Sequence, residues 1–167
     1  GATTILQGIK KFALNEIKYD PDGTAEIEDV DTAVIVVGEN PYAEFFGDIG
    51  GEMDLFQLIL TEEHQQLIQT YSQKGIKTVV VLISGRPLVV TEQIEQSDAF
   101  LAAWLPGSEG DGIAEVLFGF MDFQGKLPHS WPKSVHDYTG KYGPNYWDTS
   151  IQPLFPFGFG LTYYSKK

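Results

Sequence analysis

Hydrophobic positions along the chain follow two periods, which predict strands and helices in alternation. Residues 33–37 are an unbroken apolar run, so we expect a strand over 30–37 that is buried on both faces and therefore parallel to its neighbours. Further strands are predicted over residues 16–19, 78–83 and 99–104. Helical spacing predicts helices over residues 3–12, 62–73, 89–96 and 111–118.

Residues that cap helices support several of these boundaries. Thr61 is expected to be an N-cap, since two glutamates follow it in the first turn, where carboxylates favour the helix dipole. Gly75 is placed to end the same helix. Ser108 and Asp111 have the spacing of a capping box with Asp in place of Glu.

This order of elements, with short connections, predicts an α/β fold. We expect one domain over residues 1–167, a flavodoxin-like three-layer sandwich around a mainly parallel sheet. Residues 123–167 are rich in loops and are expected to wrap the domain as a tail. Because such a fold normally opens on a strand and this chain opens on a helix, we expect a leading strand to be missing. The resulting free sheet edge should lead to self-association or to modest stability.

Composition excludes several classes of partner. The 167 residues carry 11 basic and 23 acidic side chains, a net charge of −12, which argues against nucleic acid and anionic membranes as partners. No apolar run has the length of a membrane helix. Cysteine is absent, which removes disulfides, thiolate nucleophiles and zinc-thiolate sites and leaves the compartment open.

An acidic, aromatic loop over residues 38–48 is the strongest candidate for chemistry, because it follows a predicted buried strand. Glu44 precedes two phenylalanines, whose desolvation would suit a carboxyl that acts as a general acid. Glu39 is better placed to bond loop backbone or substrate hydroxyls, and Asp48 is the third carboxylate. On local chemistry alone, a solvated acidic loop is the more common interpretation.

Other polar residues are weaker candidates. Arg86 follows a predicted strand and could bind a carboxylate, but we favour a role in fixing a loop. Ser84 could be a hydrolase nucleophile only in a weak interpretation, because no Gly-x-Ser-x-Gly motif is present. His64, His129 and His136 have no metal-binding spacing, and no phosphate-loop motif occurs, so neither a metal nor a cofactor is predicted.

Several motifs occur together along nearly the whole chain. They are Gly38-Glu39-Asn40-Pro41-Tyr42-Ala43-Glu44 with Gly47-Asp48, Ser84-Gly85-Arg86-Pro87, Trp104-Leu105-Pro106-Gly107-Ser108-Glu109-Gly110, Gly125-Lys126-Leu127-Pro128, and Pro153-Leu154-Phe155-Pro156-Phe157-Gly158-Phe159-Gly160. In this order they resemble the C-terminal α/β domain of family 3 glycoside hydrolases, the β-glucosidase and exo-β-glucanase enzymes. In that family an N-terminal (β/α)8 barrel, which this chain lacks, carries the aspartate nucleophile.

The resemblance implies roles for the loop residues. Glu44 matches the acid/base of the family, with Glu39, Tyr42, Asp48 and Arg86 as supporting or substrate-binding residues. It implies hydrolysis of a β-glucoside or β-glucan oligosaccharide by a retaining, exo-acting enzyme without a cofactor. A secreted or periplasmic location is implied as well.

A chain without the nucleophile is expected to be inactive alone. The alternative is a non-catalytic carbohydrate-binding or interaction module that uses the same loop and the aromatic tail.

Overall fold

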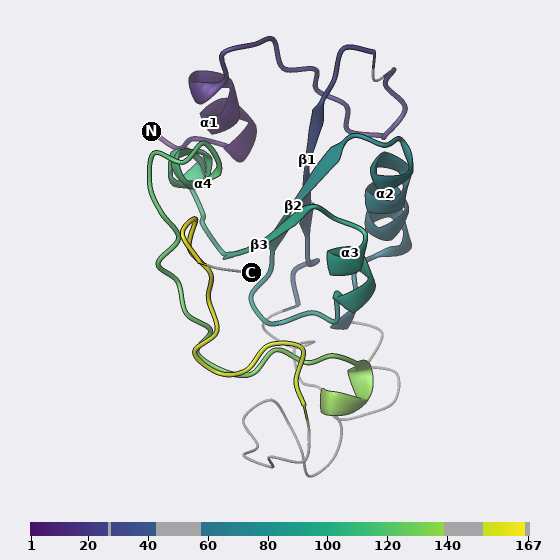
Figure 1. The fold of residues 1–167 in the computed structure, drawn as a ribbon, viewed down its shortest axis with the longest axis vertical. Coiled ribbons are helices and arrows are strands. Elements are labelled where there is room, and N and C mark those ends of the chain that lie inside the picture. Colours follow the sequence, from purple (N-terminus) through teal and green to yellow (C-terminus); the bar gives the residue numbers. More distant parts are fainter. Residues whose placement is uncertain (27, 43–57, 139–151, 166–167) are drawn as a thin grey trace.

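The computed structural model describes residues 1–26, 28–42, 58–138 and 152–165, in which helices and strands alternate (Figure 1). The elements are α1 (Ile5–Phe12), β1 (Thr32–Gly38), α2 (Glu62–Gln73), β2 (Lys77–Ile83), α3 (Thr91–Glu95), β3 (Ala99–Trp104), α4 (Gly110–Leu117) and a short 3₁₀ helix, η2 (Val135–Tyr138).

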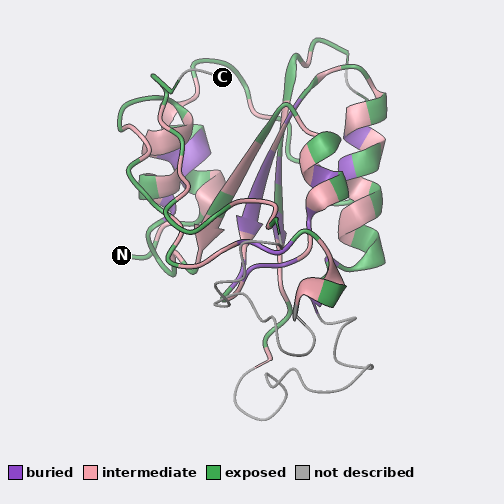
Figure 2. Ribbon diagram, turned by 60° about the horizontal axis from the view of Figure 1, so that its bottom comes forward, coloured by how far each residue is buried: buried purple, intermediate pink, exposed green. Residues whose placement is uncertain are grey.

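The three strands form a parallel sheet in the order β1-β2-β3. Ile35 of β1 pairs with Val80 of β2, which in turn pairs with Phe100 of β3. Figure 2 shows the sheet between two helical layers, with α1 and α4 on one side and α2 and α3 on the other. The predicted three-layer α/β fold with a parallel sheet is therefore confirmed.

The core lies between the sheet and the layer of α2 and α3. Alternate residues of β1 and β2 point into it, and α2 contributes Ile68 and Tyr71. Burial of each large aliphatic side chain of this kind contributes roughly 1.5–3 kcal/mol. The central strand β2 is buried over most of its length, whereas β1 is not.

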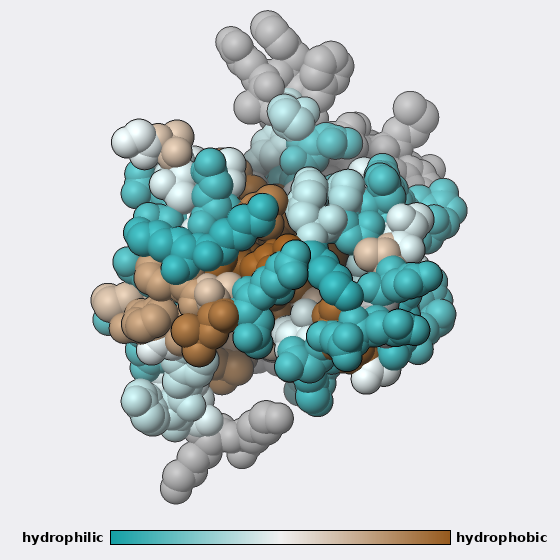
Figure 3. Space-filling model, turned by 90° about the horizontal axis from the view of Figure 1, so that it is seen from above, coloured by the Kyte–Doolittle hydropathy of each residue, from teal (hydrophilic) through white to brown (hydrophobic). Residues whose placement is uncertain are grey.

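The strand predicted over residues 30–37 forms as β1, but the prediction that it is buried on both faces is wrong. Val34 and Val36 are 38% and 42% exposed on the face opposite the core. In the described part of the chain, α1 and α4 pack against each other and lie away from β1, so neither covers this face (Figures 1 and 2). Seen from above, apolar surface lies in a hollow bordered by hydrophilic side chains (Figure 3).

Some helix ends match the predicted caps, and others do not. The Thr61 side chain accepts from the N–H of His64 at the start of α2, as predicted, and Gly75 adopts φ +76° just after the C-cap. The predicted capping box at Ser108 is wrong, because the Ser108 hydroxyl donates to the Glu109 carboxylate and α4 has no side-chain cap. The capping box lies instead at the start of α1, between Thr4 and Gln7.

The predicted strand over residues 16–19 does not form. This segment is mostly exposed, with Tyr19 at 66%. Lys18 uses its ammonium to bind the carbonyl oxygen of Glu28 at 2.8 Å, and no described strand lies alongside to complete a ladder. A short alternating segment needs such a partner, because one strand cannot satisfy its own backbone groups.

Two late segments of the chain run side by side in opposite directions (Figure 1). Leu127 donates its N–H to Phe159, and Trp131 exchanges backbone hydrogen bonds with Phe155 and Leu154. Leu127, Leu154 and Phe155 pack on the core. Within the described ranges, no helix combines the length and apolar character that a membrane crossing requires.

Candidate active site

The carboxyl ends of the three strands meet at one edge of the sheet. Glu39 follows β1 directly, and its N–H donates to the carbonyl oxygen of Ile83 at 2.9 Å. Ser84 follows β2, and its N–H donates to the carbonyl oxygen of Trp104, the last residue of β3, at 3.2 Å. These bonds hold the first residues of the two loops beside the neighbouring strands.

Arg86 and Glu39 form a nearly buried ion pair at this edge. Nε of Arg86 lies 2.5 Å from Oε1 of Glu39, and the two side chains are only 13% and 7% exposed. Water screens the attraction little at such low exposure, and either ion left alone would carry a large desolvation cost. Arg86 therefore ties the loop after β2 to the loop after β1.

Tyr42 completes this cluster of three side chains. The guanidinium carbon of Arg86 lies 3.9 Å from the centre of the Tyr42 ring, a cation–π contact of about 0.5–2 kcal/mol. The Tyr42 hydroxyl occupies the space that a Cβ on Gly85 would need. Glycine at position 85 thus lets the tyrosine lie over the arginine, and Glu39, Tyr42 and Arg86 together fix the start of the loop.

Among the described residues, one oxygen of Glu39 has no partner. Its Oε2 atom is buried and has no hydrogen-bond partner within the described ranges. A buried acceptor without a donor costs about 1–3 kcal/mol, a cost that a ligand hydroxyl or another donor would remove. The contact with Arg86 is therefore made through one carboxylate oxygen, and the other is available to bind a donor.

An aromatic cluster at the end of β3 was not predicted. Trp104 has φ +54°, an uncommon conformation for a non-glycine residue, where the register between β2 and β3 shifts. Its ring centre lies 5.7 Å from His129 and 5.8 Å from Trp131, and the Trp131 indole N–H donates to the carbonyl oxygen of Leu88 at 2.8 Å. Strained residues of this kind gather at functional sites. The only signal in the sequence was a tryptophan just before Pro106 and Gly107.

The remaining candidates differ in where they lie. Glu44 and Asp48 are outside the described residues. Ser84 is 2% exposed, which places it in the core and away from any ester substrate. His64 lies on α2 and His129 beside Trp104, and the described residues contain no group of three potential metal ligands.

Comparisons with known proteins agree on one family. The family model for the glycosyl hydrolase family 3 C-terminal domain matches residues 1–163. A periplasmic β-glucosidase of Salmonella typhimurium is 35% identical over 88% of this chain and 22% of its own length. A lysosomal β-glucosidase of Dictyostelium discoideum is 38% identical over 80% of this chain and 16% of its own length.

Solved structures give the same result for the fold. An exo-1,3/1,4-β-glucanase from a Pseudoalteromonas species superposes with a TM-score of 0.79 at 38% identity, covering 98% of this chain and 21% of that one. A β-glucosidase from Listeria innocua in complex with isofagomine has a TM-score of 0.71 at 25% identity, over 97% of this chain and 26% of that one. The chain thus spans about a sixth to a quarter of the length of these relatives.

Proposed function

The chain belongs to the family of glycosyl hydrolase family 3 C-terminal domains. We propose that it supplies the acid/base carboxyl of a retaining, exo-acting β-glucosidase or β-glucan glucohydrolase. Glu44 is the acid/base in this proposal. The observation that carries it is the cluster of Glu39, Tyr42 and Arg86, which anchors the loop that leads to Glu44.

Two carboxyl groups divide the reaction in a retaining mechanism. Glu44 protonates the glycosidic oxygen as the leaving group departs, while a carboxylate from another part of the protein attacks the sugar carbon. Glu44, now ionised, then takes a proton from the water that hydrolyses the glycosyl-enzyme intermediate. The two groups must lie about 5–5.5 Å apart, so the chain acts as half of the site.

The supporting residues act by position in this proposal. Arg86 holds Glu39, and Tyr42 covers Arg86, so these contacts restrain the backbone that enters the loop. A general acid displaced by about 1 Å can lose about 10²-fold in rate, so an anchor of this kind matters. Asp48, the third carboxylate of the loop, is proposed to support Glu44.

The substrate and partner follow from the relatives. One Listeria innocua β-glucosidase structure contains laminaribiose, which supports a β-glucoside or β-glucan oligosaccharide as substrate. The N-terminal barrel of the family would supply the nucleophile. The chain alone is therefore proposed to have no glycosidase activity.

A fusion tests this assignment. The barrel portion of the Salmonella typhimurium relative is placed ahead of this chain, and turnover of an aryl β-glucoside is measured for the fusion and for the chain alone. The fusion should be active and the chain inactive. Glu44→Gln in the fusion should lower kcat about 10²–10⁴-fold, the contribution typical of general acid catalysis.

The control and the leaving group sharpen the test. Glu52→Gln, four residues after the end of the loop over 38–48, should leave kcat unchanged. A dinitrophenyl β-glucoside, whose leaving group needs no proton, should restore the glycosylation step of Glu44→Gln. Equal loss of kcat/KM, which reports the glycosylation step, for both leaving groups would contradict the proposal, and so would turnover by the isolated chain that Glu44→Gln abolishes.

A further inference from the structure

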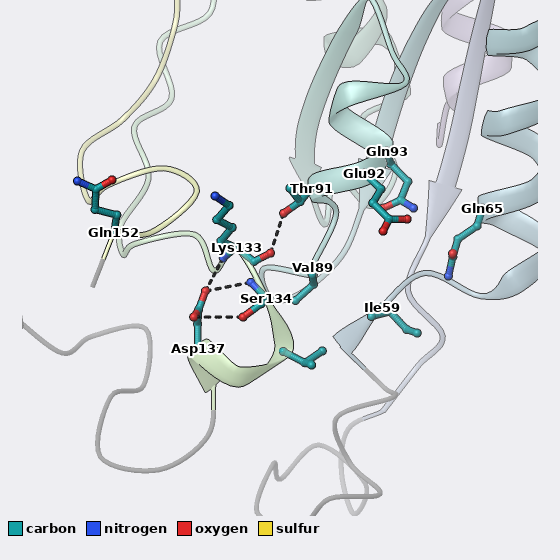
Figure 4. Close-up of a pocket in the computed structure, with 11 residues that line it drawn as sticks. Ile59, Gln65, Val89, Thr91, Glu92, Gln93, Lys133, Ser134, Asp137 and Gln152 are labelled. Carbon is teal, nitrogen blue, oxygen red and sulfur yellow. Dashed lines mark hydrogen bonds between the residues drawn. The ribbon is translucent and has the colours of Figure 1, made fainter. Parts of the chain in front are cut away.

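An open cavity of about 550 Å³ lies between α2, α3 and η2, beside the carboxyl edge of the sheet (Figure 4). We propose that this cavity binds a short neutral oligosaccharide, as a second carbohydrate site formed by this chain alone. The choice of a β-glucan among neutral saccharides rests on the proposed function. The site itself rests on the geometry and chemistry of the residues that line it.

The floor of the cavity is apolar and rigid. Ile59 and Val89 form a short parallel bridge, in which the N–H of Val89 donates to the carbonyl oxygen of Leu58 at 2.7 Å. Ile59 is 37% exposed and points toward the cavity in Figure 4. The residues on either side of this pair are at most 2% exposed and fix it to the core: Leu58, Leu60, Leu88 and Val90.

Hydrogen bonds hold the rim in place. The Thr91 hydroxyl donates to the carbonyl oxygen of Lys133 at 2.7 Å, which joins α3 to the segment before η2 (Figure 4). The Asp137 carboxylate accepts from the backbone N–H groups of Lys133 and Ser134 at 2.7 and 2.9 Å. Because these hydrogen bonds restrain the rim before a ligand arrives, less affinity should be lost to ordering of the protein.

The polar groups in the cavity suit hydroxyl groups. Gln65 from α2, Gln93 from α3 and Gln152 from the late segment bring three amides to the lining. An amide both donates and accepts, so it can pair with neighbouring sugar hydroxyls. Gln65 already donates to the carbonyl oxygen of Leu60 at 2.7 Å, which fixes its orientation and leaves its oxygen as an acceptor.

The charges in the lining favour a neutral ligand. Glu92 and Lys133 have opposite sign, and Asp137 is occupied by the backbone groups of the rim. An anion would be repelled by Glu92, and a purely apolar ligand would leave the amides unpaired at a cost of about 1–3 kcal/mol for each buried group. A pyranose ring offers both hydroxyls for the amides and C–H groups for Ile59.

The size of the cavity agrees with two or three sugar units. Pockets that hold drug-sized ligands enclose about 300–1,000 Å³, and the cavity of about 550 Å³ falls within that range. The lining joins an apolar floor to polar side chains from several elements, a combination that ligand sites share.

Calorimetric titration tests the site. Laminaritriose and cellotriose are titrated into the chain, its Glu92→Ala variant and its Glu95→Ala variant. Both glutamates are exposed on α3, but only Glu92 lines the cavity. Wild-type chain should bind one of the two trisaccharides saturably, Glu92→Ala should raise Kd about tenfold through loss of a hydroxyl contact, and Glu95→Ala should match wild type.

Two further variants keep the result clear. Ile59→Trp should obstruct the floor of the cavity and weaken binding while the urea midpoint of unfolding stays near that of wild type. Glu44→Gln should leave trisaccharide binding unchanged, and Glu92→Ala should leave aryl β-glucoside turnover by the fusion unchanged, so this site and the proposed active site can fail separately. Absence of saturable binding by the wild-type chain, or binding that Glu44→Gln removes and Glu92→Ala does not, would overturn the inference.

Discussion

The ion pair of Arg86 and Glu39 allows a test of how the candidate site is held. We predict that Arg86→Met will destabilise the chain by about 3–5 kcal/mol, because it leaves the Glu39 carboxylate buried and uncompensated. That carboxylate is 7% exposed and its second oxygen already lacks a partner among the described residues. Methionine keeps much of the apolar stem, so lost packing adds little.

The double variant separates charge from packing. Replacing Glu39 with Gln in the Arg86→Met background removes the stranded charge, so the double variant should be more stable than Arg86→Met alone. The stability of a domain is only about 5–15 kcal/mol, so the single variant should lose a large share of it. Both variants lose the cation–π contact with Tyr42, so the cost of that loss cancels when they are compared.

Urea unfolding followed by tryptophan fluorescence measures these differences, since Trp104 and Trp131 lie in the folded part near the site. Lys77→Met is the control. It breaks an ion pair of similar length, 2.7 Å, whose side chains are 73% and 43% exposed, and it should leave the midpoint nearly unchanged. A loss below about 1 kcal/mol for Arg86→Met, or additive costs in the double variant, would refute the argument from burial.

Two further predictions concern the rest of the fold. Burial and the hydrogen bond to Asp20 raise the pKa of Tyr71 to about 12, while that bond from Tyr71 holds the pKa of Asp20 below its usual value. Because Tyr71 ionises more readily when unfolded, wild-type stability should fall as pH rises from 10 toward 12, and Tyr71→Phe should flatten that fall in urea midpoints; equal slopes would contradict this. Gly110→Ala should cost about 1–3 kcal/mol in thermal unfolding, since its Cβ would meet the backbone of Thr4. Gly112→Ala, on the same helix with no atom within 4 Å of its Cβ, should be tolerated, and similar melting of both variants would count against close packing of α1 and α4.

Local rules accounted for those parts of the fold that depend on neighbours in sequence. The apolar run at 33–37 indicated β1, and the capping residue Thr61 and Gly75 marked the ends of α2. Each follows from side chains within a few residues of one another, or from backbone conformations that one residue type favours.

Predictions that depended on partners elsewhere in the chain were wrong or absent. Residues 16–19 alternate as a strand does but have no described strand beside them. One miss was local: Ser108 has a capping residue's chemistry, yet its hydroxyl donates to the neighbouring Glu109 instead. No spacing rule pointed to the positive φ of Trp104.

Apart from the strand wrongly predicted over residues 16–19, the sequence by itself determined the order of helices and strands, the parallel sheet and the family, because periodicity is local and motifs are shared with relatives. Only the tertiary structure decided which side chains meet. Glu39 and Arg86 are 47 residues apart in the chain and 2.5 Å apart in space, and the cavity draws its lining from positions 59 to 152. Such contacts depend on how strands align and helices dock, and the sum of many weak burial terms, rather than any one motif, sets that alignment.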